Sequence, residues 1–153
     1  MDKGGALILE TFIPYRLAIL SNKVSSAIAN FYAERFKIGI PEWRVLTVLS
    51  RFEGLSAAEV GEKTEIDKVA VSRAVSKLLK LGYIKRKFAK EDRRRSVLAL
   101  SANGKRVYQE VIPEALSYEK KLMNGLSATE RKTLDELLDK LMMQAISLKE
   151  KDD

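Results

Sequence analysis

Apolar residues recur at helical spacing towards both ends of the chain. Over residues 7–37 they return every three or four positions, which predicts a long amphipathic helix with Pro14 in its first turn. Gly39 and Pro41 separate this helix from a second one over residues 41–52. Residues 102–149 predict two further long helices, loosened near Pro113, and the last of them carries a regular apolar seam: Leu134, Leu138, Leu141, Ala145 and Leu148.

The centre of the chain predicts two short helices followed by a β-hairpin. Ser56 and Glu59 have the spacing of a capping box, and Asp67 and Gly82 are suited to begin and end the next helix. After Gly82 the apolar spacing becomes alternating, which predicts a hairpin over residues 83–100. The expected fold is therefore mainly α with a small β-hairpin (α+β). Within one 153-residue chain, a helix-turn-helix with a hairpin occupies residues 41–100 between the long helices of 7–37 and 102–149.

Positive charge is concentrated in this central part. The chain has a net charge of +7, and residues 67–95 alone hold 11 Lys or Arg against 3 Asp or Glu, a local excess of 8. The remaining residues then sum to −1, since 7 minus 8 is −1. Charge gathered in one segment in this way is typical of a surface that binds an anionic polymer. A solvated lysine-rich surface is the alternative interpretation.

Several classes of function are disfavoured by residue content. The chain has no cysteine and no histidine, which excludes disulfides, thiol switches and Cys/His zinc sites. No activated nucleophile, metal-ligand cluster or phosphate-binding glycine loop is recognisable, so we expect neither an enzyme nor a cofactor. No apolar run reaches the roughly 20 residues of a membrane span, and no signal peptide is recognisable. We therefore expect a cytoplasmic protein without a membrane partner.

The helix that follows Asp67 has one face suited to a DNA major groove. Its apolar residues share the opposite face, so the residues expected to point outward are Lys68, Val69, Ser72, Arg73, Ser76 and Lys77. Serine permits close approach, arginine can pair with guanine, and valine can touch a thymine methyl group. An ordinary amphipathic surface helix would show the same pattern.

The hairpin tip adds basic residues to this face. Arg93, Arg94 and Arg95 follow Asp92 between two short strands. An arginine held on such a tip can enter a DNA minor groove. We expect Asp92 to hold a neighbouring arginine through a charge-assisted hydrogen bond.

These central motifs resemble the multiple antibiotic resistance regulator (MarR) family. The stretches LGYIKR, DRRR and VLALSANG follow the family pattern, in which an Asp-Arg-Arg hairpin precedes a Leu-Ser or Leu-Thr helix cap. The matching residues are Asp92, Arg93, Arg94, Leu100 and Ser101, whereas the third arginine, Arg95, departs from the usual pair. The resemblance covers nearly the whole chain, because the family also has a long first helix and two long C-terminal helices.

The resemblance implies a winged helix-turn-helix that works as a homodimer, with the long helices of both subunits forming a dimerisation layer. Two recognition helices would enter successive major grooves of a pseudo-palindromic operator, in double-stranded DNA, and the protein would act as a transcriptional repressor. Ser72, Arg73 and Lys77 would contact the major groove, and Arg94 the minor groove. Phosphates would be bound by the remaining basic positions: Lys68, Lys87, Arg93 and Arg95.

Members of this family commonly bind small anionic, often aromatic, effectors between the dimerisation layer and the DNA-binding lobe. The stretches PYRLAILSN and IPEWRVL are similar to a subgroup that responds to hydroxycinnamates or their coenzyme A thioesters and represses aromatic-acid catabolism. Arginine beside an aromatic ring suits a carboxylate-bearing phenyl compound. The expected ligand-binding residues are Phe12, Tyr15, Arg16, Trp43, Arg44 and Thr47, although Trp43 and Arg44 are also compatible with core packing and a surface ion pair.

Two other classes of function remain compatible with the sequence. The first is an architectural or RNA-binding winged-helix protein that binds nucleic acid with little sequence preference and senses no small molecule. The second is an adaptor whose basic hairpin binds an acidic protein. Steep salt dependence of DNA binding and preference for a palindrome separate a regulator from both.

Overall fold

A computed structural model describes residues 5–92 and 94–152, and within them the chain forms six helices and a two-stranded antiparallel sheet. The chain divides into two compact units, Met1–Ala115 and Leu116–Asp153. The first unit holds most of the elements: α1 (Ile13–Phe36), α2 (Ile40–Arg51), α3 (Ala57–Thr64), α4 (Lys68–Leu81), β1 (Ile84–Phe88), β2 (Ser96–Leu100) and most of α5 (Ala102–Met123). The second holds the end of α5 and α6 (Ala128–Asp152). The mainly helical fold with a hairpin is the one expected from the sequence.

Helix α1 starts later than the apolar spacing predicts. It begins at Ile13 instead of residue 7, and the preceding residues form a turn in which the Phe12 N–H donates to the Ile8 carbonyl at 3.1 Å. Pro14 explains the start, because it fits the first turn of a helix, whereas in a helix running on from residue 7 it would lack the N–H that bonds the Glu10 carbonyl and its ring would clash there. The other helix boundaries lie within a few residues of those expected, and α5 continues through Pro113.

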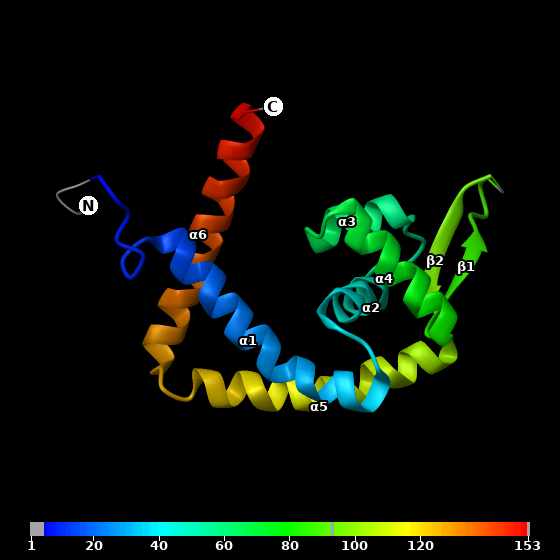
Figure 1. Cartoon of the computed structure of the whole chain (residues 1–153), viewed down its shortest axis with the longest axis horizontal. Coiled ribbons are helices and arrows are strands. Elements are labelled where there is room, and N and C mark those ends of the chain that lie inside the picture. Colours follow the sequence, from blue (N-terminus) through cyan, green and yellow to red (C-terminus); the bar gives the residue numbers. More distant parts are fainter. Residues whose placement is uncertain (1–4, 93, 153) are drawn as a thin grey trace. The chain divides into compact units, whose positions relative to one another are not determined.

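The core of the first unit lies among α2, α3, α4 and the hairpin. Figure 1 shows α4 beside α2 and α3, with β1 and β2 projecting from the same group of helices. Val45, Leu46 and Leu78 are fully buried at its centre. The end of α1 and the first half of α5 complete this core with four further buried side chains: Tyr32, Phe36, Val107 and Val111. The elements predicted to carry DNA contacts thus share one apolar core.

The hairpin is held to the helices at its base. Ile84 pairs with Leu100 and Phe88 with Ser96; Ile84, Leu98 and Leu100 are buried in the core, whereas Phe88 at the far end of β1 is exposed. The Leu98 N–H also donates to the Leu55 carbonyl at 2.8 Å, which links β2 to the segment before α3.

Helix α5 begins in close contact with the turn between α4 and β1. The Ser101 hydroxyl accepts the Gly104 N–H at 3.0 Å and donates to the Gly82 carbonyl at 2.6 Å. A Cβ atom on Gly104 would lie 1.8 Å from the Tyr83 carbonyl oxygen, so only glycine permits this approach. The segment from Leu100 to Gly104 at the start of α5 is therefore docked on the turn between α4 and β1.

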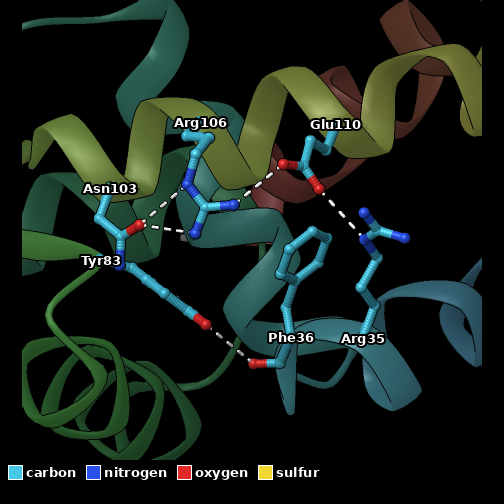
Figure 2. A network of polar contacts seen from close by, with 6 residues as sticks. All are labelled: Arg35, Phe36, Tyr83, Asn103, Arg106 and Glu110. Atoms are coloured by element: carbon cyan, nitrogen blue, oxygen red, sulfur yellow. Dashed lines mark hydrogen bonds and ion pairs between the residues drawn. The ribbon is translucent and has the colours of Figure 1, made fainter.

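The end of α1 is fixed to α5 and to the same turn. Figure 2 shows Arg35 of α1 paired with Glu110 of α5, with Nε and Oε2 3.1 Å apart, while Arg106 holds the other carboxylate oxygen at 2.9 Å. The Tyr83 hydroxyl donates to the Phe36 carbonyl at 3.3 Å. Within the first unit, these contacts join the last turn of α1 to α5 and to the turn between α4 and β1.

Helix α6, in the second unit, begins with a capping box formed by Ser127 and Glu130. The Ser127 hydroxyl accepts the Glu130 N–H at 3.1 Å, and the Glu130 carboxylate accepts the Ser127 N–H at 2.9 Å. These hydrogen bonds hold the pKa of Glu130 below its usual value. Most apolar side chains of the seam nevertheless remain exposed, including Leu138 and Leu141.

Candidate nucleic-acid interface

Helix α4 presents two faces of opposite character. Val71, Ala74 and Leu78 are buried in the core. The six residues expected to face outward are all exposed: Lys68, Val69, Ser72, Arg73, Ser76 and Lys77. Val69 is 60% exposed, although nothing in folding requires an apolar side chain at that position. The outward face of α4 thus combines an exposed valine, small hydroxyl residues and cations.

Local interactions fix where α4 begins and ends. The Asp67 carboxylate accepts the Ala70 N–H at 2.9 Å, and Gly82 ends the helix at a φ of 77°. A side-chain cap of this kind contributes about 1 kcal/mol to helix stability. The α3–α4 turn includes Glu65 at a φ of 56°, a left-handed conformation that lets the chain reverse direction between two short helices. Local sequence therefore sets the helix-turn-helix.

Lys77 also has a structural partner that the sequence analysis missed. Its ammonium Nζ lies 3.0 Å from Oε1 of Glu42, a carboxylate on α2 that is only 8% exposed as a residue. A carboxylate so little exposed needs a positive partner, and Lys77 supplies one from the neighbouring helix. Lys77 thus joins α2 to α4, whereas Arg73 forms no ion pair with any residue that the structure describes.

At the hairpin tip, Asp92 holds Arg94 by its backbone. The Asp92 carboxylate accepts the Arg94 N–H at 3.0 Å, and the Asp92 carbonyl accepts the Arg95 N–H at 3.0 Å. The expected partner was an arginine side chain, but the short aspartate side chain reaches the backbone two residues on, as in an Asx turn. The Arg94 side chain is exposed. Arg93, the other predicted tip residue, lies outside the described residues.

Arg95 turns back towards the helices. Its guanidinium group binds the Glu59 carboxylate of α3, and Glu59 also closes the capping box with Ser56. The Arg95 hydrogen bond is the largest of the interactions that lower the pKa of Glu59, followed by those with Ser56. The sequence identified Glu59 as a cap but not its pairing with Arg95, because the two residues are far apart in the chain. The predicted phosphate contact of Arg95 therefore competes with an internal partner.

The remaining predicted phosphate-binding residues are exposed on the same lobe. Lys68 opens α4, and Lys87 projects from β1. Together with Arg73 and Arg94, they give the outward side of the helix-turn-helix and its hairpin a positive charge. The structure brings these side chains onto one lobe, and their contacts with DNA stay predictions.

The predicted ligand-binding residues occupy two elements. Phe12, Tyr15 and Arg16 are exposed at the start of α1, and Arg44 is exposed on α2. The Thr47 hydroxyl donates to the Arg44 carbonyl at 2.8 Å.

Trp43 has a clear packing role. Its ring stacks between Tyr32, at a centroid distance of 5.5 Å, and Tyr108, at 5.7 Å. Burial raises the pKa of Tyr32 to about 12. Since each face of the indole contacts a tyrosine, a ligand can reach Trp43 only at its edge. The stack joins α1, α2 and α5, so Trp43 is placed to report on movements among them.

A groove of about 730 Å³ lies elsewhere on the first unit, between the hairpin, the end of α2 and the start of α5. All six predicted ligand-binding residues are described, and none of them lines it. Over the described chain, no group of three or more acidic side chains gathers to hold a metal ion. Among the helices of that same part, none combines the length and apolar character that a membrane crossing requires.

Comparison with known proteins agrees with this arrangement. Residues 37–95, from the end of α1 to the hairpin tip, match the family model described as the MarR family. An HTH-type transcriptional regulator of Bacillus cereus is 28% identical over 127 residues, covering 82% of this chain and 84% of the relative.

Solved structures extend the similarity to most of the chain. A MarR/EmrR family transcriptional regulator from Acinetobacter sp. ADP1 superposes with a TM-score of 0.83 at 29% identity, covering 92% of this chain and 99% of that one. The DNA complex of MepR from S. aureus has the same fold, with a TM-score of 0.77, 19% identity and coverage of 89% and 98%. The chain is thus similar to DNA-binding transcriptional regulators of the MarR family through the family model and the sequence relatives, and the solved structures share its winged helix-turn-helix fold.

Proposed function

We propose that the protein is a homodimeric repressor that binds a pseudo-palindromic DNA operator and responds to a small anionic aromatic ligand. The observation that carries the DNA-binding part is the outward face of α4, where Val69 and Arg73 project from a helix whose opposite face is locked into the core. A rigid helix with small, cationic and apolar side chains outward is suited to a major groove.

The hairpin supplies the second contact in this proposal. Arg94 is exposed while its backbone is held by Asp92, so its side chain starts from a defined position. Arg94 would enter the minor groove, where the negative potential is strongest when the groove is narrow. Arg73 and Ser72 would read bases, and Lys68, Lys87 and Arg93 would bind phosphates. Arg95 would bind phosphate only where it exchanges Glu59 for DNA.

The test is a binding assay with duplexes selected from a random pool. We expect a palindromic sequence to emerge and its affinity to fall by orders of magnitude between low and moderate salt. Arg73→Ala and Arg94→Ala should each weaken operator binding by about tenfold or more and relax base preference. Lys132→Ala, which removes the same charge from α6, should have little effect.

Uniform binding to unrelated duplexes would instead support an architectural or RNA-binding protein. Binding without salt dependence would support an adaptor for an acidic protein. Unchanged affinity and preference in Arg94→Ala would remove the hairpin from the proposed interface.

We propose a dimer because large apolar residues are exposed on the helices near both ends of the chain. They include Leu17 and Leu20 on α1 and Leu138, Leu141 and Ile146 on α6. Large apolar patches on a chain with a complete core of its own are typical of a subunit interface. Two subunits related by a twofold axis would place two α4 helices on a palindrome.

The effector is proposed to bind Arg16 on α1 and Arg44 on α2, and Tyr15 and Phe12 are near Arg16 in the chain. An arginine pairs with a carboxylate, and exposed aromatic rings suit a phenyl group. Hydroxycinnamates and their coenzyme A thioesters are the proposed ligands, and control of aromatic-acid catabolism is the proposed role. A ligand that binds one spacing of the recognition helices better than another would change DNA affinity.

Trp43 emission and thermal shifts provide the screen for this site. Aromatic acids and their coenzyme A thioesters should alter both, and Arg16→Ala or Arg44→Ala should abolish the response while DNA binding without ligand persists. Ligand binding that neither substitution weakens would place the effector elsewhere. Failure of every ligand to bind or to alter DNA binding would contradict the sensor.

A further inference from the structure

The groove beside the hairpin is a hollow built from three elements of the first unit. β1 contributes Lys85 and Lys87, the end of α2 contributes Leu49, and the start of α5 contributes Lys105 and Tyr108. Its volume of about 730 Å³ falls within the range of roughly 300–1,000 Å³ usual for small-molecule sites. It therefore has the size of a site for one small organic ligand.

Cationic side chains predominate in the lining. Five of its residues are cations, namely Lys85, Lys87, Lys90, Arg95 and Lys105, against the two carboxylates of Glu53 and Glu91. Of the cations, only Arg95 forms an ion pair within the described part of the chain, with Glu59. Neighbouring lysines repel one another, so their convergence opposes folding slightly and favours an anion between them.

The groove also has an apolar wall suited to a ring. Val97 and Ala99 of β2 line it and pair with Lys87 and Lys85, so they share the face of the hairpin that carries these lysines, and the largely exposed Phe88 stands at the hairpin end. Tyr108 lines the groove and stacks on Trp43. Carboxylates such as Glu53 can accept hydrogen bonds from hydroxyl groups of a sugar. The lining thus offers partners for phosphates, a ring and hydroxyl groups together.

The position of the groove separates it from the proposed DNA-reading residues of α4. No residue of α4 lines it, although the whole of that helix lies in the described chain. Arg94 at the hairpin tip is described too and does not line it either. A ligand in the groove would therefore leave α4 and Arg94 free, and among the described residues it would share only Lys87 and Arg95 with the proposed phosphate contacts.

We propose that this groove binds a small organic phosphate with a ring and at least two negative charges, of which a nucleoside diphosphate is representative. This site goes beyond the proposed effector region at Arg16 and Arg44. Occupancy also acts on the hairpin, because a phosphate competes with Glu59 for Arg95 and so loosens the contact between the hairpin and α3.

Calorimetry on the full chain tests the site with three probes: adenosine diphosphate, pyrophosphate and adenosine. We expect the diphosphate to bind, pyrophosphate to bind more weakly, and adenosine to give no measurable heat. Trp43 emission should change with the diphosphate, because Tyr108 lies between the groove and the indole. Absence of diphosphate binding, or equal affinity for adenosine, overturns the proposal.

Lys105→Gln, at an exposed position of α5, supplies the matched variant, and Lys132→Gln on α6 is its control. Lys105→Gln should weaken diphosphate binding by about tenfold or more, and Lys132→Gln should leave it unchanged. If both substitutions weaken diphosphate binding equally, the diphosphate is attracted by the net charge of the protein, and the proposed site is overturned. If Lys105→Gln instead lowers DNA affinity and the salt slope by about one, while the diphosphate does not bind, the groove belongs to the DNA interface.

The effect on the hairpin is measured with operator DNA. A saturating concentration of the diphosphate should change operator affinity in the wild-type chain, and Lys105→Gln should shift this response to higher diphosphate concentration. Operator affinity that does not respond to a diphosphate shown to bind would overturn the competition for Arg95.

Discussion

The helices of the central lobe and those near the ends of the chain all carry leucines and other large apolar residues, but these side chains have very different surroundings. In the lobe, Val45 and Leu46 of α2 are fully buried, with 0% exposure. On α6, Leu138 and Leu141 are each 49% exposed. The start of α1 resembles α6, because Leu17 and Leu20 are also exposed.

The difference lies in what each helix packs against. The lobe brings α2, α3, α4 and the hairpin together, so each apolar face meets another from the same chain. A helix that exposes an apolar seam is suited to bury that seam against another helix, as in a subunit interface. We therefore infer that the lobe carries the stability of the chain, and that the ends carry its assembly.

The largest expected effect comes from breaking the lobe at Gly104. Helix propensity alone predicts that Gly104→Ala stabilises α5 by about 1 kcal/mol. The new Cβ would instead lie 1.8 Å from the Tyr83 carbonyl oxygen, a backbone atom that cannot move independently. We expect the clash to dominate and to lower the free energy of unfolding by about 3 kcal/mol or more, measured by urea denaturation.

Gly125→Ala is the matched control at the other region, because a Cβ there would meet nothing within 4 Å. Its unfolding free energy should stay within about 0.5 kcal/mol of wild type. Equal effects of the two substitutions would show that the lobe is no more tightly packed at this point than the loop before α6.

The next largest effect is expected at the ends and concerns assembly. Leu141→Glu places a charge on the exposed seam of α6, so it should raise the dimer dissociation constant by roughly 100-fold, or about 2.7 kcal/mol. Sedimentation equilibrium measures this change. The near-ultraviolet dichroism of Trp43 should stay unchanged, because the indole packs within the lobe.

Lys140→Glu introduces the same carboxylate beside the seam and should leave the dimer intact. A wild-type chain that is monomeric at every concentration would contradict the assembly role of α6. So would a Leu141→Glu chain as dimeric as wild type.

The smallest effect tests the ion pair between the hairpin and α3. Arg95 and Ser56 lower the pKa of Glu59 in the folded chain below 4.5. The ionised carboxylate is therefore favoured by folding, and its contribution is present above about pH 4.5 and lost as the pH falls through the lowered value. Glu59→Gln should lower the thermal midpoint slightly at neutral pH, and the difference from wild type should shrink as the solution is acidified.

Glu62→Gln, on the same helix and exposed, controls for the general effect of removing a carboxylate. The difference between wild type and Glu59→Gln should close with acid, whereas Glu62→Gln should show no such pH-dependent loss. If the difference in thermal midpoint between wild type and Glu59→Gln does not change with pH, the charge of Glu59 does not hold the hairpin.

The local features of the fold were predictable from particular residues. Asp67 and Gly82 placed the ends of α4, because caps act within a few residues of the positions that they satisfy. The alternation of apolar and polar residues after Gly82 indicated the hairpin, because this periodicity is also a property of neighbouring residues. The start of α1 was predicted wrongly, since apolar spacing alone neglected that Pro14 cannot continue a helix from the preceding turn.

The pairings between distant residues were not predictable in this way. Nothing near Arg95 indicates that it binds Glu59 instead of facing solvent, and nothing near Lys77 indicates the little-exposed Glu42. The stacking of Trp43 between two tyrosines follows from the packing of three helices. A residue type can predict that a partner is needed, but its identity depends on which elements meet.

The sequence by itself determined the elements, the concentration of positive charge and the face of α4 that points outward, because helix caps, periodicity and charge are properties of neighbouring residues. Only the tertiary structure decided which cations are already engaged within the lobe and which stay exposed for a ligand. It also placed Lys105 and the lysines of β1 around one groove. Such placement depends on side chains far apart in the chain, which packing brings within reach of one another.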